Sequence, residues 1–308
     1  MDPVPRLIGQ VSQKRLRQHL FHLAKDPLPC RKLNYTLPGH DRCTLYEADD
    51  FIAAQLEACG YSVAREGVPV QAFRPDRSKP LPHQFARPEP GDPTYTAYNL
   101  YARKTGTELP GEYLVAIAHK DSQSWTDSPG AYDNAVGTVA ALELARLLEP
   151  YPARRSLWFV FCNEEHTPWT SEVVAAGMAR RGGPVRAVLN LDGLGGKAQA
   201  DVEAGRRTHV TRFVTPEGGA LADRASALNR RYGIGLETSK FESERPNDDD
   251  GSFVRAGIPA AVLHIGSFPY GNPDYHAAGD VPEKVDLGNV TMAVQLALAA
   301  LVDVDREV

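Results

Sequence analysis

The sequence is poor in cysteine and in long apolar runs. Its four cysteines stand at positions 30, 43, 59 and 162, so none follows another at the CxxC spacing of a structural zinc site. We expect reduced thiols, although Cys30 and Cys43 flank one loop and could pair in an exported protein. No run reaches the roughly 18 apolar residues of a membrane span, and the N-terminus, MDPVPRLIGQ, lacks the apolar stretch of a signal peptide. These absences predict a soluble cytoplasmic protein, or the mature form of an exported one, with no membrane partner.

Positive charge is also in short supply. The chain has 34 Lys and Arg residues against 39 Asp and Glu residues, and its formal net charge is -5 at pH 7. A surface that binds nucleic acid needs clustered Lys and Arg, whereas the basic pairs here, such as Arg154-Arg155, stand among acidic residues. Nucleic acid is therefore excluded as an expected partner. With 42% hydrophobic residues, the chain has the composition of a globular protein that can bury a core.

Strand and helix patterns alternate along most of the chain. Strands of about five residues between helices of about 10–15 residues indicate a mostly parallel sheet that is covered on both faces. The predicted fold is a three-layer α/β/α sandwich with a mostly parallel, mixed central sheet, in a single domain over residues 1–308. The predicted strands are 61–73 (broken near Glu66-Gly67), 96–104, 113–118, 156–162, 187–191, 209–213 and 260–265, and the predicted helices are 11–25, 45–59, 136–148, 171–181, 219–232 and 289–304.

One proline-rich segment, residues 74–93, interrupts this alternation. Each proline lacks a backbone donor and fixes φ, so this density of prolines excludes a helix or a central strand. Loops longer than about 12–15 residues inside a domain are more often functional or mobile than simple connections. We therefore predict a long surface loop, called the proline-rich loop below, that could overhang a cleft.

Polar residues follow several of the predicted buried strands. His119, Glu165 and Asp192 each come shortly after a strand, and Asp133 comes directly before a helix. Taken singly, these residues are typical of a surface turn, a solvated face or a helix cap. Because the carboxyl ends of parallel strands meet at one edge of the sheet, we expect the four side chains to lie close together. Massed carboxylates are costly without a cation, and carboxylate with imidazole suits zinc or a similar divalent ion.

Residue spacing within two of these segments suggests separate tasks. A bend after His119 would let Asp121 accept a hydrogen bond from the second ring nitrogen, the usual support for a metal-bound imidazole. The adjacent Glu164 and Glu165 cannot face one ion in the same way. One can bind metal while the other acts as a general base on bound water.

The motifs together resemble those of the double-zinc aminopeptidases, typified by secreted bacterial leucine aminopeptidases. This family is related to glutaminyl cyclases and to the transferrin receptor ectodomain. The likeness runs from paired N-terminal helices through Asn99 to the end of the chain. It is carried in order by AHKDS, PGAYDNAVG, NEE, NLDG, AGIPA and YHAAGDVPEKVD.

The resemblance implies two zinc ions and five ligands. His119 and Asp192 would hold one ion, Glu165 and His276 the other, and Asp133 would bridge the two. A bridging carboxylate suits metals roughly 3.5–4 Å apart.

The resemblance also implies the catalytic residues. Asp121 would orient His119, and Glu164 would take a proton from the bridging water and pass it to the leaving amine. Tyr275 resembles a family tyrosine that helps to stabilise the tetrahedral oxyanion, although simple packing beside the ligand is an equally good explanation.

Several positions depart from the family pattern. Tyr132 stands where the family often has Asp or Asn, and Asp250 stands where it has histidine. The segment after Glu165 reads HTPWTS in place of a glycine-rich turn, so His166 and Trp169 are predicted to line the substrate pocket in an unusual way. The other candidates for the pocket walls are Trp125, Phe268 and Tyr270.

The leading prediction is a metal-dependent aminopeptidase that acts on peptides with a free N-terminus. A one-zinc glutaminyl-cyclase-like acyltransferase is an alternative, favoured by Trp169 but not by Asn134, where those relatives tend to carry Ser. A second alternative is a non-catalytic binding protein, which would be expected to have lost ligands, whereas all five are present here. Neither the side-chain preference nor the oligomeric state can be read from the sequence.

Overall fold

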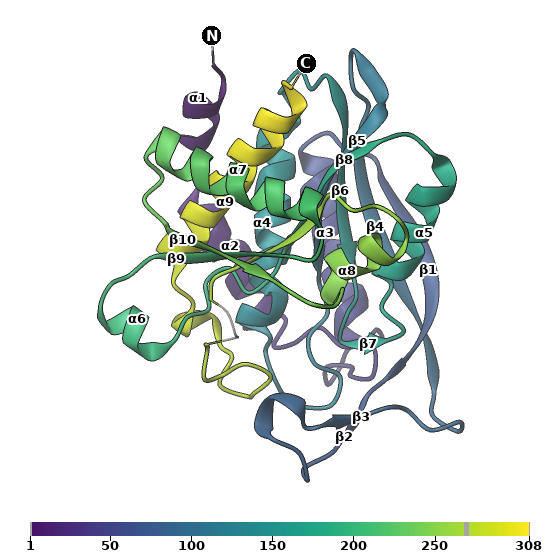
Figure 1. Cartoon of the computed structure of the whole chain (residues 1–308). Helices are drawn as coiled ribbons and strands as arrows, with labels where there is room; N and C mark the ends of the chain where they lie inside the picture. The colour runs from purple at the N-terminus through teal and green to yellow at the C-terminus, as the bar shows by residue number, and fades with distance from the viewer. Residues whose placement is uncertain (1, 268–270, 308) are drawn as a thin grey trace.

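A nine-stranded mixed sheet forms the centre of the computed structural model, which describes residues 2–267 and 271–307 (Figure 1). Its strands are β1 (Val63–Ala72), β4 (Thr94–Lys104), β5 (Leu109–His119), β6 (Arg155–Cys162), β7 (His166–Thr167), β8 (Val185–Leu191), β9 (Thr208–Phe213), β10 (Glu237–Glu242) and β11 (Ala261–Ile265). They lie in the order β10-β9-β11-β8-β5-β6-β4-β1-β7. β11, β8, β5 and β6 run parallel, whereas β4, β1 and β7 are each antiparallel to the neighbour before them. The sheet is therefore mixed with a parallel centre, as predicted.

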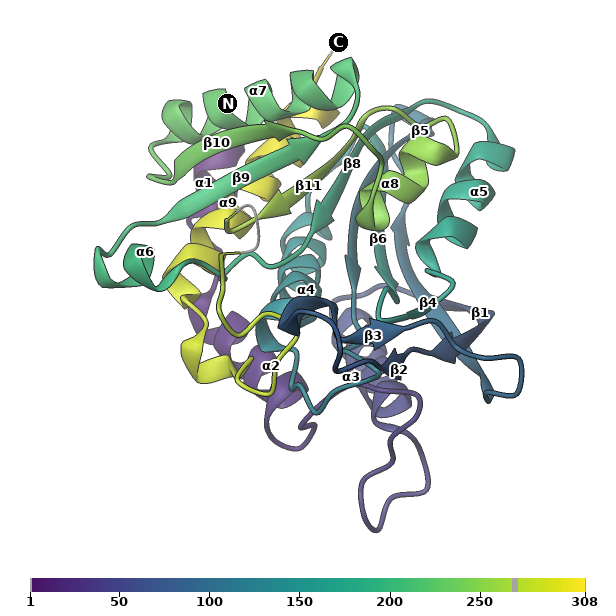
Figure 2. The same cartoon turned by 60° about the horizontal axis from the view of Figure 1, so that its bottom comes forward.

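Helices cover both faces of this sheet, which confirms the predicted three layers. One face carries α1 (Val4–Ile8), α2 (Gln13–Ala24), α3 (Thr44–Ala58), α4 (Val136–Leu148), α7 (Pro216–Tyr232) and α9 (Leu287–Asp305). The other face carries α5 (Ser171–Arg181) and α8 (Asp248–Arg255), and Figure 2 shows the two groups on opposite sides. Alternate residues of β5 enter the two cores, with Leu114 and Ala116 on the first face and Val115 and Ile117 on the second. A strand buried on both faces must be apolar at every position, which explains the continuous run YLVAIA.

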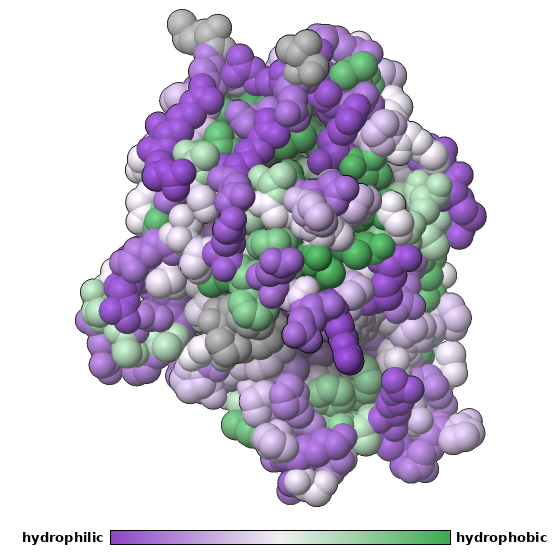
Figure 3. Space-filling view, in the orientation of Figure 1, coloured by the Kyte–Doolittle hydropathy of each residue, from purple (hydrophilic) through white to green (hydrophobic). Residues whose placement is uncertain are grey.

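Helix α9 is the most apolar long helix among the described residues, although no run of 18 apolar residues occurs in the sequence. The helix has 19 residues, and an 18-residue window within it has a mean hydropathy of 1.6. By length and composition alone, α9 could therefore cross a membrane. However, 67% of that window is buried, and α9 packs against α1, α2, α4 and α7. The view in Figure 3 shows mainly hydrophilic residues over α7, which lies in front of α9 in Figure 1. A core helix passes the same test, and α9 has the contacts of one.

The proline-rich loop forms a small layer below the sheet. It contains β2 (Arg74–Pro75), the 3₁₀ turn η1 (Leu81–His83) and β3 (Phe85–Ala86), and β2 pairs with β3 as a two-stranded hairpin (Figures 1 and 2). The short β7 pairs with the end of β1, where Gln71 lies opposite Thr167. This pairing brings the start of the loop beside the segment that follows Glu165.

The predicted break in the first strand is wrong. Glu66 pairs with Asn99 and Gly67 pairs with Tyr98, so β1 passes through this point in regular antiparallel register. A cross-strand aromatic covers the glycine, since a β-carbon at Gly67 would lie 3.5 Å from the Tyr98 ring. Other elements were not predicted: β10, α8, and the short α6 (Gln199–Glu203). The four cysteines are free thiols, as expected.

Candidate metal centre

Five buried side chains converge at the carboxyl ends of the central strands. His119 is the last residue of β5, Asp192 directly follows β8, and Glu165 lies between β6 and β7. Asp133 lies in η2 (Ala131–Ala135) directly before α4, and His276 lies in the loop after β11. Each is at most 8% exposed. Ligand atoms of His119, Asp133 and Glu165 lie within 4.8 Å of one another.

The two histidines face opposite oxygens of Asp133. His119 Nε2 lies 3.1 Å from Asp133 Oδ1 and 3.7 Å from Asp192 Oδ1. His276 Nε2 lies 2.9 Å from Asp133 Oδ2 and 3.5 Å from Glu165 Oε1. The five groups therefore divide into two pairs with Asp133 between them, the arrangement of a carboxylate that bridges two ions.

The ring nitrogens of the histidines are oriented for metal binding. His276 Nδ1 lies 2.6 Å from the Pro82 carbonyl oxygen, which can only accept, so this nitrogen carries a proton. In the neutral ring, Nε2 then presents its lone pair to the carboxylate oxygens of Asp133 and Glu165. His119 is held similarly, with Nδ1 3.3 Å from Asp121 Oδ1. Lone pairs of nitrogen and carboxylate oxygen face each other favourably only around a cation or a proton, so this donor set fits zinc or a similar divalent ion.

The pKa values in the cluster show that it demands positive charge. Burial, with a contribution from Asp133, raises the pKa of Glu165 to about 7. Burial also raises the pKa of Asp192 to about 6. Burial alone would lower the pKa of His276, but Glu165 and Asp133 raise it to about 10. A divalent cation would supply the charge that these groups otherwise obtain from protons.

Asp121 holds together the segments that carry the candidate ligands. Besides facing His119, its carboxylate accepts hydrogen bonds from the backbone N–H groups of Glu164 and Glu165, each at 2.9 Å. It also lies 2.8 Å from His166 Nδ1. Burial opposes ionisation of Asp121, but the contacts with the two histidines hold its pKa below the ordinary value. The contact predicted between Asp121 and His119 is thus part of a larger network.

The prediction that His166 lines the substrate pocket is wrong. Its side chain is fully buried, with Nδ1 facing Asp121 and Nε2 accepting a hydrogen bond from the Leu33 backbone at 3.4 Å. The ring therefore lies behind Asp121, where it orients a carboxylate. Its position directly after Glu165 was the only sequence signal for this role.

Asp250 also lies away from the pocket. It is fully buried and lies 3.1 Å from Arg212 Nη2, and its Oδ1 accepts a 3.3 Å hydrogen bond from Asn190. Burial raises the pKa of Asp250 to about 7, despite the nearby Arg212. The neighbouring Asp249 accepts a hydrogen bond from the Cys162 thiol, with Sγ and Oδ2 3.0 Å apart. Where the family has histidine, the structure has a charge pair that joins α8 to β9.

Glu164 lies next to the ligand Glu165 but makes different contacts. Its side chain is half-buried, and Oε2 has no hydrogen-bond partner in the described part of the chain. Burial, followed by repulsion from Asp249 and Asp248, raises the pKa of Glu164 well above its ordinary value. A carboxylate with these properties is suited to taking up a proton.

Two further residues of the centre were missed in the sequence. Gln123 Nε2 donates to Asp133 Oδ2 at 2.7 Å and to Glu165 Oε1 at 3.2 Å, so it links two carboxylates. Asp280 accepts from the backbone N–H groups of Tyr132 and Asp133, at 2.7 and 3.1 Å, and so fixes the loop before α4. Asp280 stands inside the quoted motif YHAAGDVPEKVD, whereas Gln123 directly follows the motif AHKDS and nothing in the sequence marked it.

Two tyrosines lie against the centre. The fully buried Tyr132 ring fits over Gly193 and Gly196, because a β-carbon at either glycine would lie within 2.7 Å of ring atoms. Tyr275 stacks on His276 with ring centroids 3.8 Å apart. The two tyrosine rings meet edge to face at 6.1 Å. Tyr275 is therefore placed beside a candidate ligand, as expected from the sequence.

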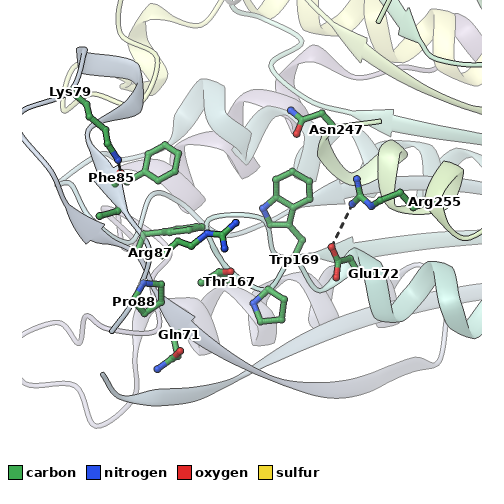
Figure 4. Close-up of a pocket in the computed structure, with 13 residues that line it drawn as sticks. Gln71, Lys79, Phe85, Arg87, Pro88, Thr167, Trp169, Glu172, Asn247 and Arg255 are labelled. Atoms are coloured by element: carbon green, nitrogen blue, oxygen red, sulfur yellow. Dashed lines mark hydrogen bonds and ion pairs between the residues drawn. The ribbon is translucent and has the colours of Figure 1, made fainter. Parts of the chain in front are cut away.

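A cavity of about 860 Å³ opens beside the segment that follows Glu165 (Figure 4). Trp169 forms part of its wall and faces Phe85 and Arg87 of the proline-rich loop. Trp125 lines a second cavity, of about 370 Å³, on the other side of the loop. The two remaining candidate wall residues, Phe268 and Tyr270, lie outside the described residues.

Two curated proteins are similar in sequence to this chain. A protein of Saccharomyces cerevisiae named as a probable aminopeptidase is 25% identical over 218 residues, which make up 67% of this chain and 57% of that protein. A probable zinc metalloprotease of Leptosphaeria maculans is 28% identical over 200 residues, or 62% of this chain and 43% of that protein. The match therefore spans about half the length of these relatives.

Solved structures share the fold over nearly the whole chain. An aminopeptidase from Aneurinibacillus sp. strain AM-1 has a TM-score of 0.72 at 15% identity, covering 96% of this chain and 95% of that one. A glutaminyl cyclase of Bacteroides thetaiotaomicron also has a TM-score of 0.72, at 16% identity, covering 96% of this chain and 98% of that one. At such low identity the likeness shows the fold, and function must be argued from the site.

A sequence profile decides the family. The profile of peptidase family M28 matches residues 99–301, a range that begins in β4, ends in α9 and contains all five candidate ligands. The family resemblance predicted from the motifs is confirmed: the chain belongs to peptidase family M28.

Proposed function

We propose that the protein is a two-zinc aminopeptidase that hydrolyses the N-terminal peptide bond of peptides. The observation that carries this proposal is the placement of the two imidazole Nε2 atoms against opposite oxygens of Asp133. The names of the relatives, a probable aminopeptidase and a probable zinc metalloprotease, support both the reaction and the metal.

The ligands would be shared between two sites. His119 and Asp192 would hold one ion, Glu165 and His276 the other, and Asp133 both. Bound zinc would polarise the scissile carbonyl and acidify a water molecule. Asp121 would act through its neighbours, because it fixes the His119 ring and the backbone of Glu164 and Glu165.

Glu164 would carry the proton. Its Oε2 atom would accept a proton from the attacking water and then deliver it to the nitrogen of the leaving amine. This role agrees with an Oε2 that makes no hydrogen bond to the described residues and with the raised pKa of Glu164. Tyr275, stacked on His276, is the candidate for binding the oxyanion of the tetrahedral intermediate.

A one-zinc glutaminyl-cyclase-like acyltransferase is the second candidate. Trp169 in the cavity wall favours it, because an aromatic wall could enclose a glutaminyl side chain. Asn134 favours the peptidase. Its side chain bonds the Leu191 carbonyl and the Gly137 N–H, both at 2.8 Å, and a serine is too short to bridge these groups.

Metal content and substrate choice separate the two candidates. The proposal expects close to two zinc ions per chain in the purified protein, together with release of nitroaniline from leucine p-nitroanilide. One zinc per chain with cyclisation of N-terminal glutamine would establish the acyltransferase. Protein that neither binds zinc nor turns over either substrate would refute both.

A further inference from the structure

The larger cavity lies close to the candidate metal centre. Thr167 and Trp169 line it and follow the Glu164-Glu165 pair directly in the chain. On the opposite wall, Phe85 lines the same cavity, and its ring centroid lies 6.5 Å from that of His276. The larger cavity is therefore bounded by a segment that follows Glu165 and by a ring that lies beside His276.

The smaller cavity lies on the other side of His276. It is lined by Arg77, Gln84 and Trp125, together with His276 itself. This is the side of the ring on which Nδ1 meets the carbonyl of Pro82, whereas Nε2 points to the carboxylates. Because Nε2, on the other edge of the ring, faces the candidate ligands, we take the larger cavity as the place for substrate.

Most charges in the wall of the larger cavity are compensated. Lys79 Nζ lies 3.2 Å from Asp76, and Arg255 Nη2 lies 3.5 Å from Glu172, the contact drawn as a dashed line in Figure 4. Arg87 has no hydrogen bond or ion pair with any described residue, and it extends from the loop toward Thr167 and Trp169 (Figure 4). Within the described residues it is the uncompensated charge of this wall.

We propose that the larger cavity receives the residue that follows the cleaved bond, and that Arg87 binds a carboxylate on it. This inference rests on the proposed peptidase function. A guanidinium forms paired hydrogen bonds with a carboxylate, and such a contact beside the leaving-group site would select among leaving groups. The carboxylate is either the terminal carboxylate of a dipeptide or the side chain of an acidic residue, and in both cases it belongs to the departing amino acid.

The test compares leaving groups that differ in one carboxylate. The substrates are Leu-Gly against Leu-Gly-amide for the terminal carboxylate, and Leu-Asp-amide against Leu-Asn-amide for the side chain. In at least one pair, we expect kcat/KM to be about 5- to 20-fold higher for the substrate that carries the carboxylate. The factor is modest because Arg87 is exposed to solvent, which weakens a charged contact. Arg87→Gln should abolish that preference, and Arg87→Lys should retain part of it.

Two controls make the result specific. Arg77→Gln removes an arginine of the same loop that lines the smaller cavity, and it should leave the preference intact. Hydrolysis of leucine p-nitroanilide, which has no carboxylate, should be unchanged in Arg87→Gln. Equal rates within both pairs in the wild type, or a preference that survives Arg87→Gln, would overturn this inference alone. A wild type that hydrolyses none of these substrates, the anilide included, would overturn the proposed function and this inference with it.

Discussion

The group of five candidate ligands and the proline-rich loop meet at His276, but they are built differently. The five candidate ligands are at most 8% exposed and lie at strand ends or in loops held by Asp121 and Asp280. The loop, by contrast, contains ion pairs near the surface, such as that between Arg74 and Asp92. One of its large apolar side chains, Leu81, is 50% exposed. Core packing therefore fixes the chemistry, whereas a surface segment shapes the space for substrate. Substitutions on the two sides should have effects of different size and kind.

The largest effect is expected at the centre of the buried side. Asp133→Ala removes a carboxylate that faces both histidines, so the two proposed metal sites lose the ligand that they share. We expect loss of bound metal and a fall in kcat/KM of at least about 10³-fold. Elemental analysis of the dialysed protein, run beside the activity assay, measures both. Full metal content in this variant would show that Asp133 is not a shared ligand.

Glu164→Gln should separate chemistry from metal binding on the same side. The amide keeps the size of the side chain but cannot accept and return a proton, so kcat should fall by about 10²–10⁴-fold. Metal content and the unfolding temperature should match the wild type. Retained activity would mean that another group is the base, and lost metal would mean that Glu164 is a ligand.

Asp121→Asn tests the support behind the ligands. The amide keeps one acceptor oxygen, so only one of the backbone N–H groups of Glu164 and Glu165 keeps its partner, and His119 is oriented less firmly. We expect about a 10- to 100-fold loss in metal affinity, measured by competition with a chelator. Activity should return at saturating zinc to a larger extent than in Asp133→Ala. No recovery at any zinc concentration would place Asp121 in the chemical step.

The loop should matter less, and mainly at one of the two ions. Replacing residues 78–84 by a short Gly-Ser linker removes the Pro82 carbonyl that orients His276. We expect about a 10-fold weaker affinity at one zinc site, with the other site and the overall stability little changed. Pro82→Ala is the matched control, because it keeps the carbonyl and should behave nearly as wild type. An equal loss of both ions would show that the loop supports the whole centre and would remove the contrast between the two sides.

The buried side could largely be predicted from the sequence. Residues such as His119 and Asp192 directly follow continuous apolar strands, and the topology of a parallel sheet then brings them together. His276 could not be placed this way, because the loop that carries it has no periodic pattern. It entered only through the family resemblance.

Contacts between distant parts of the chain were much less predictable, and so was helix α8, for physical reasons. The partner of His276 is a backbone carbonyl, which every residue possesses, so no residue type marks it. The role of His166 depends on Asp121, which lies 45 positions away. Helix α8 was missed because it begins with three aspartates and contains Gly251, a weak helix former. Contacts between residues far apart in the chain produce no pattern in the sequence around either residue.

The most direct test of the central claim is the number and position of bound metal ions in the intact protein. A crystal structure of zinc-loaded protein, with anomalous diffraction collected at the zinc absorption edge, should show two peaks. We expect one peak between His119 and Asp192 and one between Glu165 and His276, both within bonding distance of Asp133 and roughly 3.5–4 Å apart. A single peak, or peaks away from Asp133, would contradict the account.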